Sequence, residues 1–375
     1  MRAPVYLDYN ATAPAKPAVI AAVAAALAET GNASSVHRFG RLTRRTVETA
    51  RDQVAALVNA SPASVVFTGS GTEANNLALH RAQGQAVLVS AIEHDCVLRA
   101  APDATLIPVT RDGVVDLEAL DRMLAGTSSA LVAVMLANNE TGVVQPLAEI
   151  VRIARAHGAS VHCDAVQAAG KVAIDMQALG VDTLALSAHK LGGPQGVGAL
   201  IVSDRVAMRP LLVGGGQERG RRAGTENVAG IAGFGVAAGL ATTDLPQMQA
   251  LAPLRDATET RLLRVAPEAV IFGAAVKRLP NTICVAMPGV AAETQVMALD
   301  LAGVAVSAGS ACSSGKVKAS HVLTAMGMAP LAGAAIRFSA GWRSTAEDFD
   351  RFVETWTALW ARLGAPRVNS VAPAA

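Results

Sequence analysis

The amino-acid sequence predicts an α/β protein, with a large domain built on a mostly parallel sheet of seven strands, covered by helices on both faces, and a smaller α+β domain after it. Two observations carry this prediction. Short apolar runs rich in β-branched residues alternate with helical stretches through the N-terminal part of the chain, which is typical of parallel sheets. The chain of 375 residues is also 51% hydrophobic and only 17% charged, so it has ample apolar surface for a large core.

Two helices are predicted before the sheet begins. Residues 16–29 are rich in alanine and other good helix formers, and residues 41–58 repeat apolar positions at helical spacing. We expect the strands of the large sheet to be the short apolar runs that follow, which are residues 65–68, 86–90, 105–109, 130–136, 160–163, 183–187 and 198–202.

A domain boundary is predicted at residues 245–253, where proline and polar residues interrupt the pattern before a helix over residues 254–265. The elements predicted beyond it are strands at residues 269–272, 282–286, 304–307 and 335–339, and helices at residues 293–301 and 345–363. We therefore expect a large domain over residues 15–250, a small domain formed by residues 1–14 and 251–365, and a flexible tail at residues 366–375.

Charge and cysteine spacing argue against several classes of partner. The formal net charge is only +2, which gives no basic field for nucleic acid. The N-terminal residues MRAPVYLDYN lack the apolar core of a signal peptide, and the apolar stretch 228–241 is shorter than the roughly 20 residues that span a bilayer. The four cysteines form no CxxC pair, which argues against a permanent metal site. We expect a cytoplasmic protein with no nucleic-acid or membrane partner.

The segment SAHKLGGP places Ser187, His189 and Lys190 together in a Gly/Pro-bounded loop after a predicted strand. A lysine in such a loop can form a Schiff base with pyridoxal phosphate, and the hydroxyl and imidazole beside it can bind the phosphate. A lone lysine after a strand is more often a solvated surface charge. The interpretation therefore needs support from other motifs.

Asp164 and Gln167, in the segment HCDAVQ, supply that support. Asp164 ends a predicted buried strand, which is the usual place for ligands in open α/β sheets. Its carboxylate can pair with the protonated pyridine nitrogen of the cofactor, and the Gln167 amide can hydrogen-bond the phenolic oxygen. If Asp164 stood alone, an N-cap of the following helix would be the preferred interpretation.

Three further segments follow predicted strands. TGSGTEANN, which contains Gly71 and Thr72, leads into a helix with small residues whose N–H groups suit a phosphate, and it matches neither a dinucleotide nor a nucleotide-triphosphate loop. His94 in EHD can lie over a cofactor ring or shuttle a proton, and Asn139 in NNETG can bind cofactor or substrate. A structural histidine and a plain turn are the alternatives for these last two.

Cys312 is surrounded by small polar residues in SAGSACSSG, which predicts an exposed thiol. Cys96, Cys163 and Cys284 lie among Val, Leu, Ile or Ala, so we expect them to be small buried hydrophobes.

Two arginine-containing segments complete the set. Arg337 in IRFS is a suitable bidentate partner for a substrate carboxylate, with a salt bridge between domains as the alternative. The loop GRRAGTEN, which contains Thr225, offers cations, amides and a hydroxyl for a phosphate, but it is equally compatible with a solvated loop.

Taken in order, these segments resemble the cysteine desulfurases of the class V aminotransferase group, which are fold type I pyridoxal-phosphate enzymes. The resemblance runs from about Tyr6 to Arg343, and the cysteine loop with the RAGTEN block is similar to the NifS/IscS-like branch. The matching motifs are LDYNATAP, GNASSVHRFG, SGTEANN, EHD, NNETGVVQP, HCDAVQAAGK, SAHKLGGPQGVGAL, GGGQERGRRAGTEN, SAGSACSSG and IRFS.

The resemblance implies removal of sulfur from L-cysteine, giving L-alanine and a persulfide on Cys312 for iron–sulfur cluster assembly or other sulfur transfer. It implies that Lys190 holds pyridoxal phosphate, that His94 lies over the ring, and that Asp164 and Gln167 meet the ring nitrogen and the phenolic oxygen. The residues implied for the phosphate are Gly71, Thr72, Ser187 and His189. In the family's homodimers the residue matching Thr225 reaches the phosphate of the other subunit, and Asn139 and Arg337 would meet cofactor and substrate.

Four positions depart from the family pattern without touching this implied chemistry. Gly192 stands where an aromatic residue is frequent, Gln195 stands where a lysine is frequent, and Asp95 and Cys96 vary an EHH-like block. The sulfur acceptor, an iron–sulfur scaffold protein or another protein, stays open, and the persulfide could meet iron transiently there.

Two other functions remain as alternatives. Transamination or selenocysteine cleavage would use Lys190 and Asp164 without Cys312. A sulfur-relay or assembly scaffold would have only a vestigial catalytic site.

Overall fold

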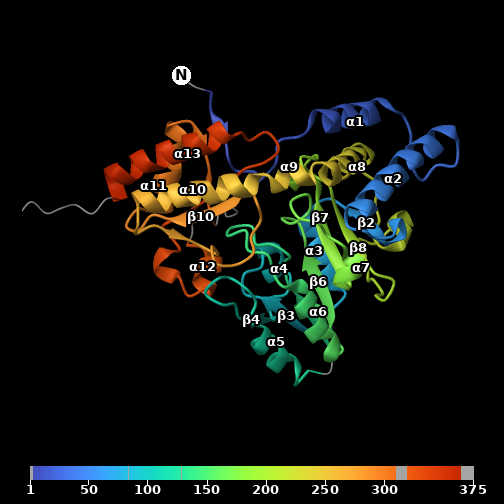
Figure 1. Cartoon of the computed structure of the whole chain (residues 1–375). Coiled ribbons are helices and arrows are strands. Elements are labelled where there is room, and N and C mark those ends of the chain that lie inside the picture. Colours follow the sequence, from blue (N-terminus) through green and yellow to red (C-terminus); the bar gives the residue numbers. More distant parts are fainter. Residues whose placement is uncertain (1–2, 83, 128, 310–318, 365–375) are drawn as a thin grey trace, which may run out of the picture.

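The computed structural model describes residues 3–82, 84–127, 129–309 and 319–364 (Figure 1). Cys312 and the tail predicted at residues 366–375 lie outside these ranges. Within them the predicted α/β fold is confirmed, with a seven-stranded sheet, a four-stranded sheet and a two-stranded pair.

The seven-stranded sheet is mostly parallel, as predicted. Its strands, in spatial order, are β2 (Val65–Thr68), β8 (Gly198–Val202), β7 (Thr183–Ser187), β6 (Ser160–Asp164), β5 (Ala130–Ala133), β3 (Ala86–Ser90) and β4 (Thr105–Ile107). The strands from β7 to β4 pair in parallel, and β8 pairs antiparallel with both β7 and β2. The carboxyl ends of β2, β3, β5, β6 and β7 therefore meet at one edge of the sheet.

Helices cover both faces of this sheet, because alternate strand residues point to opposite sides. The helices of this part are α1 (Pro17–Ala28), α2 (Arg38–Leu57), α3 (Gly71–His80), α4 (Asp95–Leu98), α5 (Leu117–Leu124), α6 (Leu147–Ala156), α7 (Met176–Leu179) and α8 (Val228–Thr243). Leu184 and Ile201 share a core with residues of α2, α6 and α8. Ala185 and Leu200 pack on the opposite face against α3.

The helix α8 is an apolar core helix that packs closely against α2. A Cβ atom on Gly235 would lie only 2.6 Å from the Cα atom of Ala50, so the approach of the two helices requires glycine at this position. Among the described residues no single helix is long and apolar enough to cross a membrane. By length and composition alone, α8 and the bent continuation Leu245–Val265 would be long and apolar enough together.

The remaining elements form a second core. The four-stranded antiparallel sheet has the order β12 (Ser307–Ala308), β13 (Ala335–Ser339), β10 (Thr282–Ala286) and β9 (Val270–Ile271), and β1 (Val5–Tyr6) pairs in parallel with β11 (Val304–Ala305). The helices here are α9 (Leu245–Gln249), α10 (Leu251–Val265), α11 (Ala292–Leu301), α12 (His321–Ala325) and α13 (Ala346–Leu359). Residues of β1, β10, β13, α10, α11 and α13 line the second core, and Figure 1 shows these helices grouped around β10.

Several predicted elements differ from the structure. The predicted strands 105–109 and 269–272 are shorter, as β4 and β9. The predicted break at residues 245–253 is largely helical, because Pro246 and Pro253 lie in the first turns of α9 and α10, where a missing N–H group is tolerated. The predicted strand at residues 304–307 is divided between β11 and β12, which belong to different sheets. The predicted strand 130–136 ends at Ala133. We keep the division into domains near residue 250 as a proposal.

A buried ion pair ties α2 to the loop that carries Glu218. The Arg51 guanidinium donates to both Glu218 carboxylate oxygens, at 2.8 and 2.9 Å, and both side chains are buried. Glu218 also accepts the N–H of Phe67 in the edge strand β2, at 3.0 Å. Glu218 has a φ of 47°, a conformation that is costly for a residue other than glycine. The pair therefore helps to hold this loop in place.

We predict that Glu218→Ala lowers the free energy of unfolding by about 3–5 kcal/mol, because it leaves the buried Arg51 charge without its buried partner. Chemical denaturation followed by circular dichroism measures this change. The control is Glu48→Ala, which removes an exposed partner of the same arginine and should cost less than about 1 kcal/mol. Equal effects of the two substitutions would contradict the prediction.

Candidate functional site

The strand ends at one edge of the large sheet surround a cavity. Its polar lining comes from the residues that follow β2, β3, β5, β6 and β7, as expected for a ligand site in an open α/β sheet. Nine residues predicted from the sequence line this one cavity, namely Gly71, Thr72, His94, Asn139, Asp164, Gln167, Ser187, His189 and Lys190. Their roles stay predictions. The structure also adds Asn75 and Cys96 to the lining.

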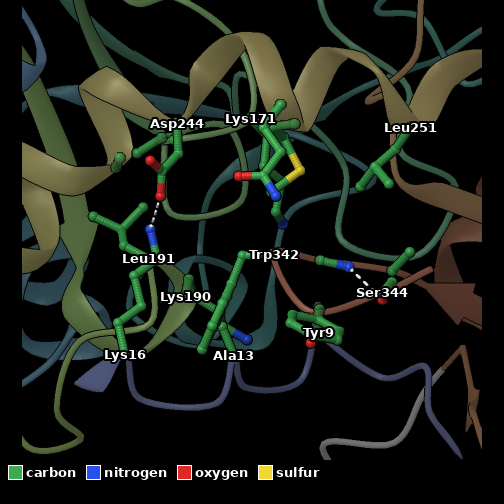
Figure 2. Close-up of a pocket in the computed structure, with 17 residues that line it drawn as sticks. Tyr9, Ala13, Lys16, Lys171, Lys190, Leu191, Asp244, Leu251, Trp342 and Ser344 are labelled. Carbon is green, nitrogen blue, oxygen red and sulfur yellow. Dashed lines mark hydrogen bonds and ion pairs between the residues drawn. The ribbon is translucent and has the colours of Figure 1, made fainter. Parts of the chain in front are cut away.

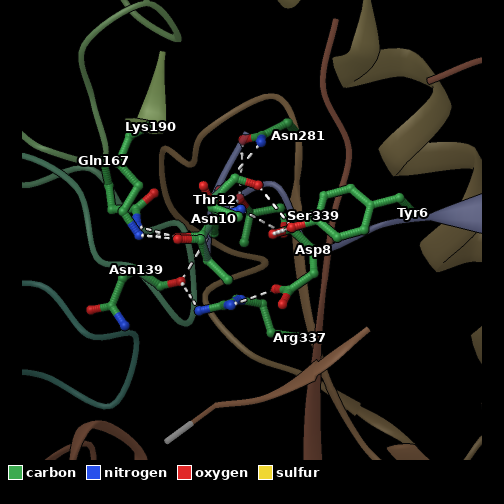
Figure 3. A network of polar contacts seen from close by, with 12 residues as sticks. Tyr6, Asp8, Asn10, Thr12, Asn139, Gln167, Lys190, Asn281, Arg337 and Ser339 are labelled. Atoms are coloured by element: carbon green, nitrogen blue, oxygen red, sulfur yellow. Dashed lines mark hydrogen bonds and ion pairs between the residues drawn. The ribbon is translucent and has the colours of Figure 1, made fainter. Parts of the chain in front are cut away.

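The Lys190 amine enters the cavity from the turn after β7. Its Nζ atom donates to the backbone oxygens of Asn10 and Ala11, at 2.5 and 2.8 Å. The N-terminal segment that leads from β1 therefore lies against the amine, and Figure 3 shows Lys190 pointing toward Asn10.

Asp164 ends β6 and is almost fully buried. Its Oδ2 atom accepts a hydrogen bond of 2.6 Å from Asn75 Nδ2, and its Oδ1 atom accepts one of 2.9 Å from the Val166 N–H. In the described chain no helix begins directly after Asp164, so the carboxylate does not act as a helix cap. It is a fixed acceptor on the cavity wall.

Gln167 belongs to a buried network with Lys171 and Asn10, and Figure 3 shows Gln167 beside Asn10. The Lys171 amine donates to Gln167 Oε1 at 2.7 Å and to Asn10 Oδ1 at 2.9 Å, and Gln167 Nε2 donates to the Asn10 carbonyl at 2.8 Å. Burial, followed by the charges of Lys190 and Arg337, lowers the pKa of Lys171 well below its usual range. The orientation of the Gln167 amide is therefore set by a lysine that the sequence did not single out.

His94 and Cys96 lie together at the start of α4. The His94 imidazole caps this helix, because its Nδ1 atom accepts the Cys96 N–H at 3.2 Å. The Cys96 Sγ atom lies 3.0 Å from the same nitrogen and 3.2 Å from Asn75 Nδ2. The prediction that Cys96 is a buried hydrophobe is therefore wrong: its thiol is partly exposed and lines the cavity. Cys163 and Cys284 are fully buried, as predicted.

The first turn of α3 forms a second wall of the cavity. Ser70 caps the helix by accepting the Glu73 N–H, and Gly71 and Thr72 follow at positions where helix N–H groups have no partner within the helix. A Cβ atom on Gly71 would lie 2.9 Å from Val166 Cγ2 and 3.2 Å from Ser187 Cβ. Glycine is therefore required where this turn approaches the carboxyl ends of β6 and β7.

His189 stands beside this turn. Its Nδ1 atom lies 3.2 Å from Thr12 Oγ1, and burial together with the Lys190 charge lowers the pKa of His189 to about 4. The imidazole is therefore neutral near pH 7 and can donate only one N–H.

Arg337 lies outside this lining, in an ion pair. Its Nη2 atom donates to Asp8 Oδ1 at 2.7 Å and its Nη1 atom donates to the Asn139 carbonyl at 3.1 Å (Figure 3). Its Nε atom is buried without a hydrogen-bond acceptor. Asp8 and Arg337 both belong to the predicted small domain, so this ion pair is not the salt bridge between domains that was the predicted alternative. The guanidinium lies next to the backbone of the cavity residue Asn139.

Like Arg337, Thr225 is not part of this lining, and it is exposed on the loop before α8. Cys312 lies outside the described residues. The described residues on either side of its segment, Gly309 and Ala319, line a neighbouring hollow together with His94 and Asn139.

Figure 2 shows a smaller hollow that Lys190 also lines. It is lined by Lys171, Trp342 and the Lys16–Asp244 ion pair, whose atoms are 2.7 Å apart, and its volume is about 70 Å³. This volume accommodates only a few water molecules. Among the residues that the structure describes, no group of three His, Cys, Asp or Glu side chains could hold a metal ion.

Comparison with known proteins gives consistent matches over nearly the whole chain. A family model described as aminotransferase class-V matches residues 5–352. A cysteine desulfurase of Trichormus azollae is 41% identical, over 96% of this chain and 94% of the relative. The cysteine desulfurase IscS of Dictyoglomus turgidum is 39% identical, over 93% of each chain. The crystal structure of a NifS-like protein from Rickettsia africae superposes with a TM-score of 0.89 at 37% identity, over 96% of this chain and 99% of that one.

We predict that Cys96 is the reactive thiol among the three described cysteines. Burial raises the pKa of the Cys163 and Cys284 thiols, which keeps them as unreactive neutral thiols, whereas Cys96 lines an open cavity. In a native Cys312→Ala variant, iodoacetamide should label Cys96 and leave Cys163 and Cys284 unlabelled, as measured by peptide mass spectrometry. The denatured variant, in which all three should react, is the control. Labelling of a buried cysteine before Cys96 would refute this assignment.

Proposed function

The chain belongs to the aminotransferase class-V family, and from this membership we propose that it is a cysteine desulfurase that depends on pyridoxal phosphate. It converts L-cysteine to L-alanine and leaves a persulfide on Cys312. The observation that supports this most is the meeting of the Lys190 amine, the Asp164 carboxylate and the His94 imidazole in one cavity.

The residues present fit this cofactor. Asp164 offers a carboxylate to a protonated ring nitrogen, and the Gln167 amide nitrogen, which donates one hydrogen to Asn10, carries a second one for a phenolic oxygen. The narrow first turn of α3, where a Gly71 side chain would collide with Val166, suits a phosphate next to Thr72. Ser187 and His189 would complete this phosphate site.

Individual residues of the chain would then bind the cofactor and the substrate and transfer protons. Pyridoxal phosphate, when bound, would supply the electron sink that allows a proton to leave the substrate Cα. Lys190 would hold the cofactor and, after its release, take that proton, and His94 would move a proton on the same path. Arg337 would bind the substrate carboxylate beside Asn139, in exchange for its present pairing with Asp8.

The sulfur transfer would use Cys312 as the nucleophile. Its thiolate would attack the substrate sulfur, so that an S–S bond forms while the C–S bond breaks and its electron pair stays with carbon. Protonation of that carbon gives alanine. One L-cysteine and one thiol thus become one L-alanine and one persulfide, and no external oxidant is needed. This role is supported by Gly309 and Ala319, the described residues on either side of the Cys312 segment, because both line a hollow together with His94 and Asn139.

The partners of the protein are proposed on the same basis. We propose a cytoplasmic homodimer in which Thr225 of each subunit reaches the phosphate held by the other, because the exposed position of Thr225 leaves it available to a second chain. The persulfide would pass to an iron–sulfur scaffold protein or another sulfur acceptor, with no nucleic acid bound directly and no permanent metal.

The first test follows the visible absorption of the purified protein and its products. The unaltered protein should absorb near 400–430 nm (roughly, for a lysine-bound cofactor) and should form alanine and persulfide from L-cysteine. Cys312→Ala should keep the absorption and lose both products, whereas Lys190→Ala should lose the absorption as well. Cys284→Ala, which changes a buried cysteine of β10, is the matched control and should keep all three signals.

The outcomes separate this function from its alternatives. An oxo acid in place of alanine would indicate transamination, and persulfide transfer at the normal rate by Cys312→Ala would refute the role of that thiol. A protein that binds no cofactor would favour a sulfur-relay scaffold instead.

The role of Arg337 gives a separate prediction. Arg337→Gln should raise KM for L-cysteine by about 10–100-fold with a smaller change in kcat, because a charged hydrogen bond to the substrate is worth about 1.5–3 kcal/mol. The matched control is Arg278→Gln, which breaks another buried ion pair, with Glu259, away from the cavity. If both variants changed KM equally, Arg337 would have only a structural role.

A further inference from the structure

Behind Asp164 lies a buried row of polar side chains that the proposed reaction does not use. Asn75 comes from α3, His162 from β6 and Thr183 from β7, and all three are at most 1% exposed. His162 and Thr183 are direct neighbours in the sheet, because they are paired in the register of β6 and β7. The row leads from the interior of the sheet to the cavity wall.

The contacts along this row are continuous. His162 Nδ1 lies 2.9 Å from Thr183 Oγ1, His162 Nε2 lies 2.9 Å from Asn75 Oδ1, and Asn75 Nδ2 lies 2.6 Å from Asp164 Oδ2. All of these distances are those of good hydrogen bonds.

The donor and the acceptor of each hydrogen bond follow from the Asp164 carboxylate, which is the end of the row at the cavity. An ionised carboxylate only accepts hydrogen bonds, so Asn75 must turn its amide nitrogen to Asp164 and its oxygen to His162. His162 Nε2 must then carry a hydrogen. Burial, followed by the Arg81 charge, lowers the pKa of His162 to about 3, so the ring is neutral and its Nδ1 atom accepts a hydrogen from Thr183.

The charges around Asp164 agree with this direction. The buried Glu93 carboxyl has its pKa raised well above the usual range, by burial first and by Asp164 second. This shift favours the neutral form of Glu93, whereas Asp164 accepts two N–H hydrogen bonds, as a carboxylate does. The Arg81 charge acts on His162 as well.

We propose that Thr183, His162 and Asn75 form a one-directional chain of hydrogen bonds that orients Asp164 and stabilises its negative charge. Asn75 and His162 are thus positioning residues of the cofactor site. This inference rests on the proposed function, because it assumes that Asp164 meets the ring nitrogen of pyridoxal phosphate. A merely structural row would satisfy buried polar groups without any effect on that nitrogen.

Cofactor binding to Asn75→Ala tests the inference, with two ligands that differ only at the ring nitrogen. These are pyridoxal 5′-phosphate and its 1-deaza analogue, in which a C–H group replaces the nitrogen. We expect Asn75→Ala to bind pyridoxal phosphate about 10–100-fold more weakly, the effect of one hydrogen bond to a charged group, and to bind the analogue as the unaltered protein does. Asn76→Ala is the matched control, because the neighbouring amide bonds only to backbone oxygens of Thr72 and Cys96.

Each outcome decides one question. An equal loss for both ligands in Asn75→Ala would overturn the inference and leave the proposed function intact. Failure of the unaltered protein to bind either ligand would overturn the proposed function.

If Asn75→Ala does not fold, nitrogen-15 NMR of the unaltered, histidine-labelled holoenzyme still tests the chain, with His162→Gln used for assignment. We expect a neutral His162 ring with its hydrogen on Nε2. Its nitrogen-15 chemical shifts should not change between about pH 6 and pH 9, because this range lies well above the pKa of about 3. A hydrogen on Nδ1, or a charged ring, would refute the proposed direction.

Discussion

The parallel pairing of β5, β6 and β7 is the constraint on which the candidate site depends. Parallel strands end at the same edge, so Asn139 after β5, Asp164 at the end of β6 and Lys190 after β7 come together although they are far apart in the sequence. The antiparallel strand β8 then returns the chain between β7 and β2. This return gives β2 the same direction as β7, so that β2 also ends at this edge and brings the first turn of α3 to the cavity.

Asn10 makes the cavity depend on the N-terminal segment as well. Its carbonyl accepts hydrogen bonds from Lys190 and Gln167 (Figure 3). Its Oδ1 atom accepts one from Lys171, and its Nδ2 atom donates to Thr282 Oγ1 in β10. One asparagine thus joins residues that follow β6 and β7 to a strand of the other sheet. Because these contacts are buried, separating the two sheets would leave several polar groups unsatisfied at once, so the geometry of the site is tied to the packing of the second core.

The sequence predicted the strands better than the surroundings of individual side chains. The runs 65–68, 86–90, 183–187, 198–202, 282–286 and 335–339 match strands to the residue. Cys96 is followed by Val97 and Leu98, yet the cap formed by His94 turns its thiol into the cavity. The partners of Asn75 lie on β6 and α4, and the Arg337–Asp8 pair joins β13 to the segment after β1. Such contacts between distant segments leave no local pattern in a single sequence.

The distribution of charge explains why this interior suits an anionic ligand. Lys171, Lys190 and Arg337 are close enough for the last two to lower the pKa of Lys171, which burial lowers further. Asp8 pairs with Arg337, but the contacts of Lys171 and Lys190 named above are amide and backbone oxygens, which carry no full charge. Three basic side chains thus lie close together in this interior. A phosphate on the cofactor and a carboxylate on the substrate would each bring negative charge to them, and a ligand that binds only the folded chain also stabilises that chain. The mutual repulsion of these side chains, which disfavours the ligand-free cavity, would thus favour the proposed ligands.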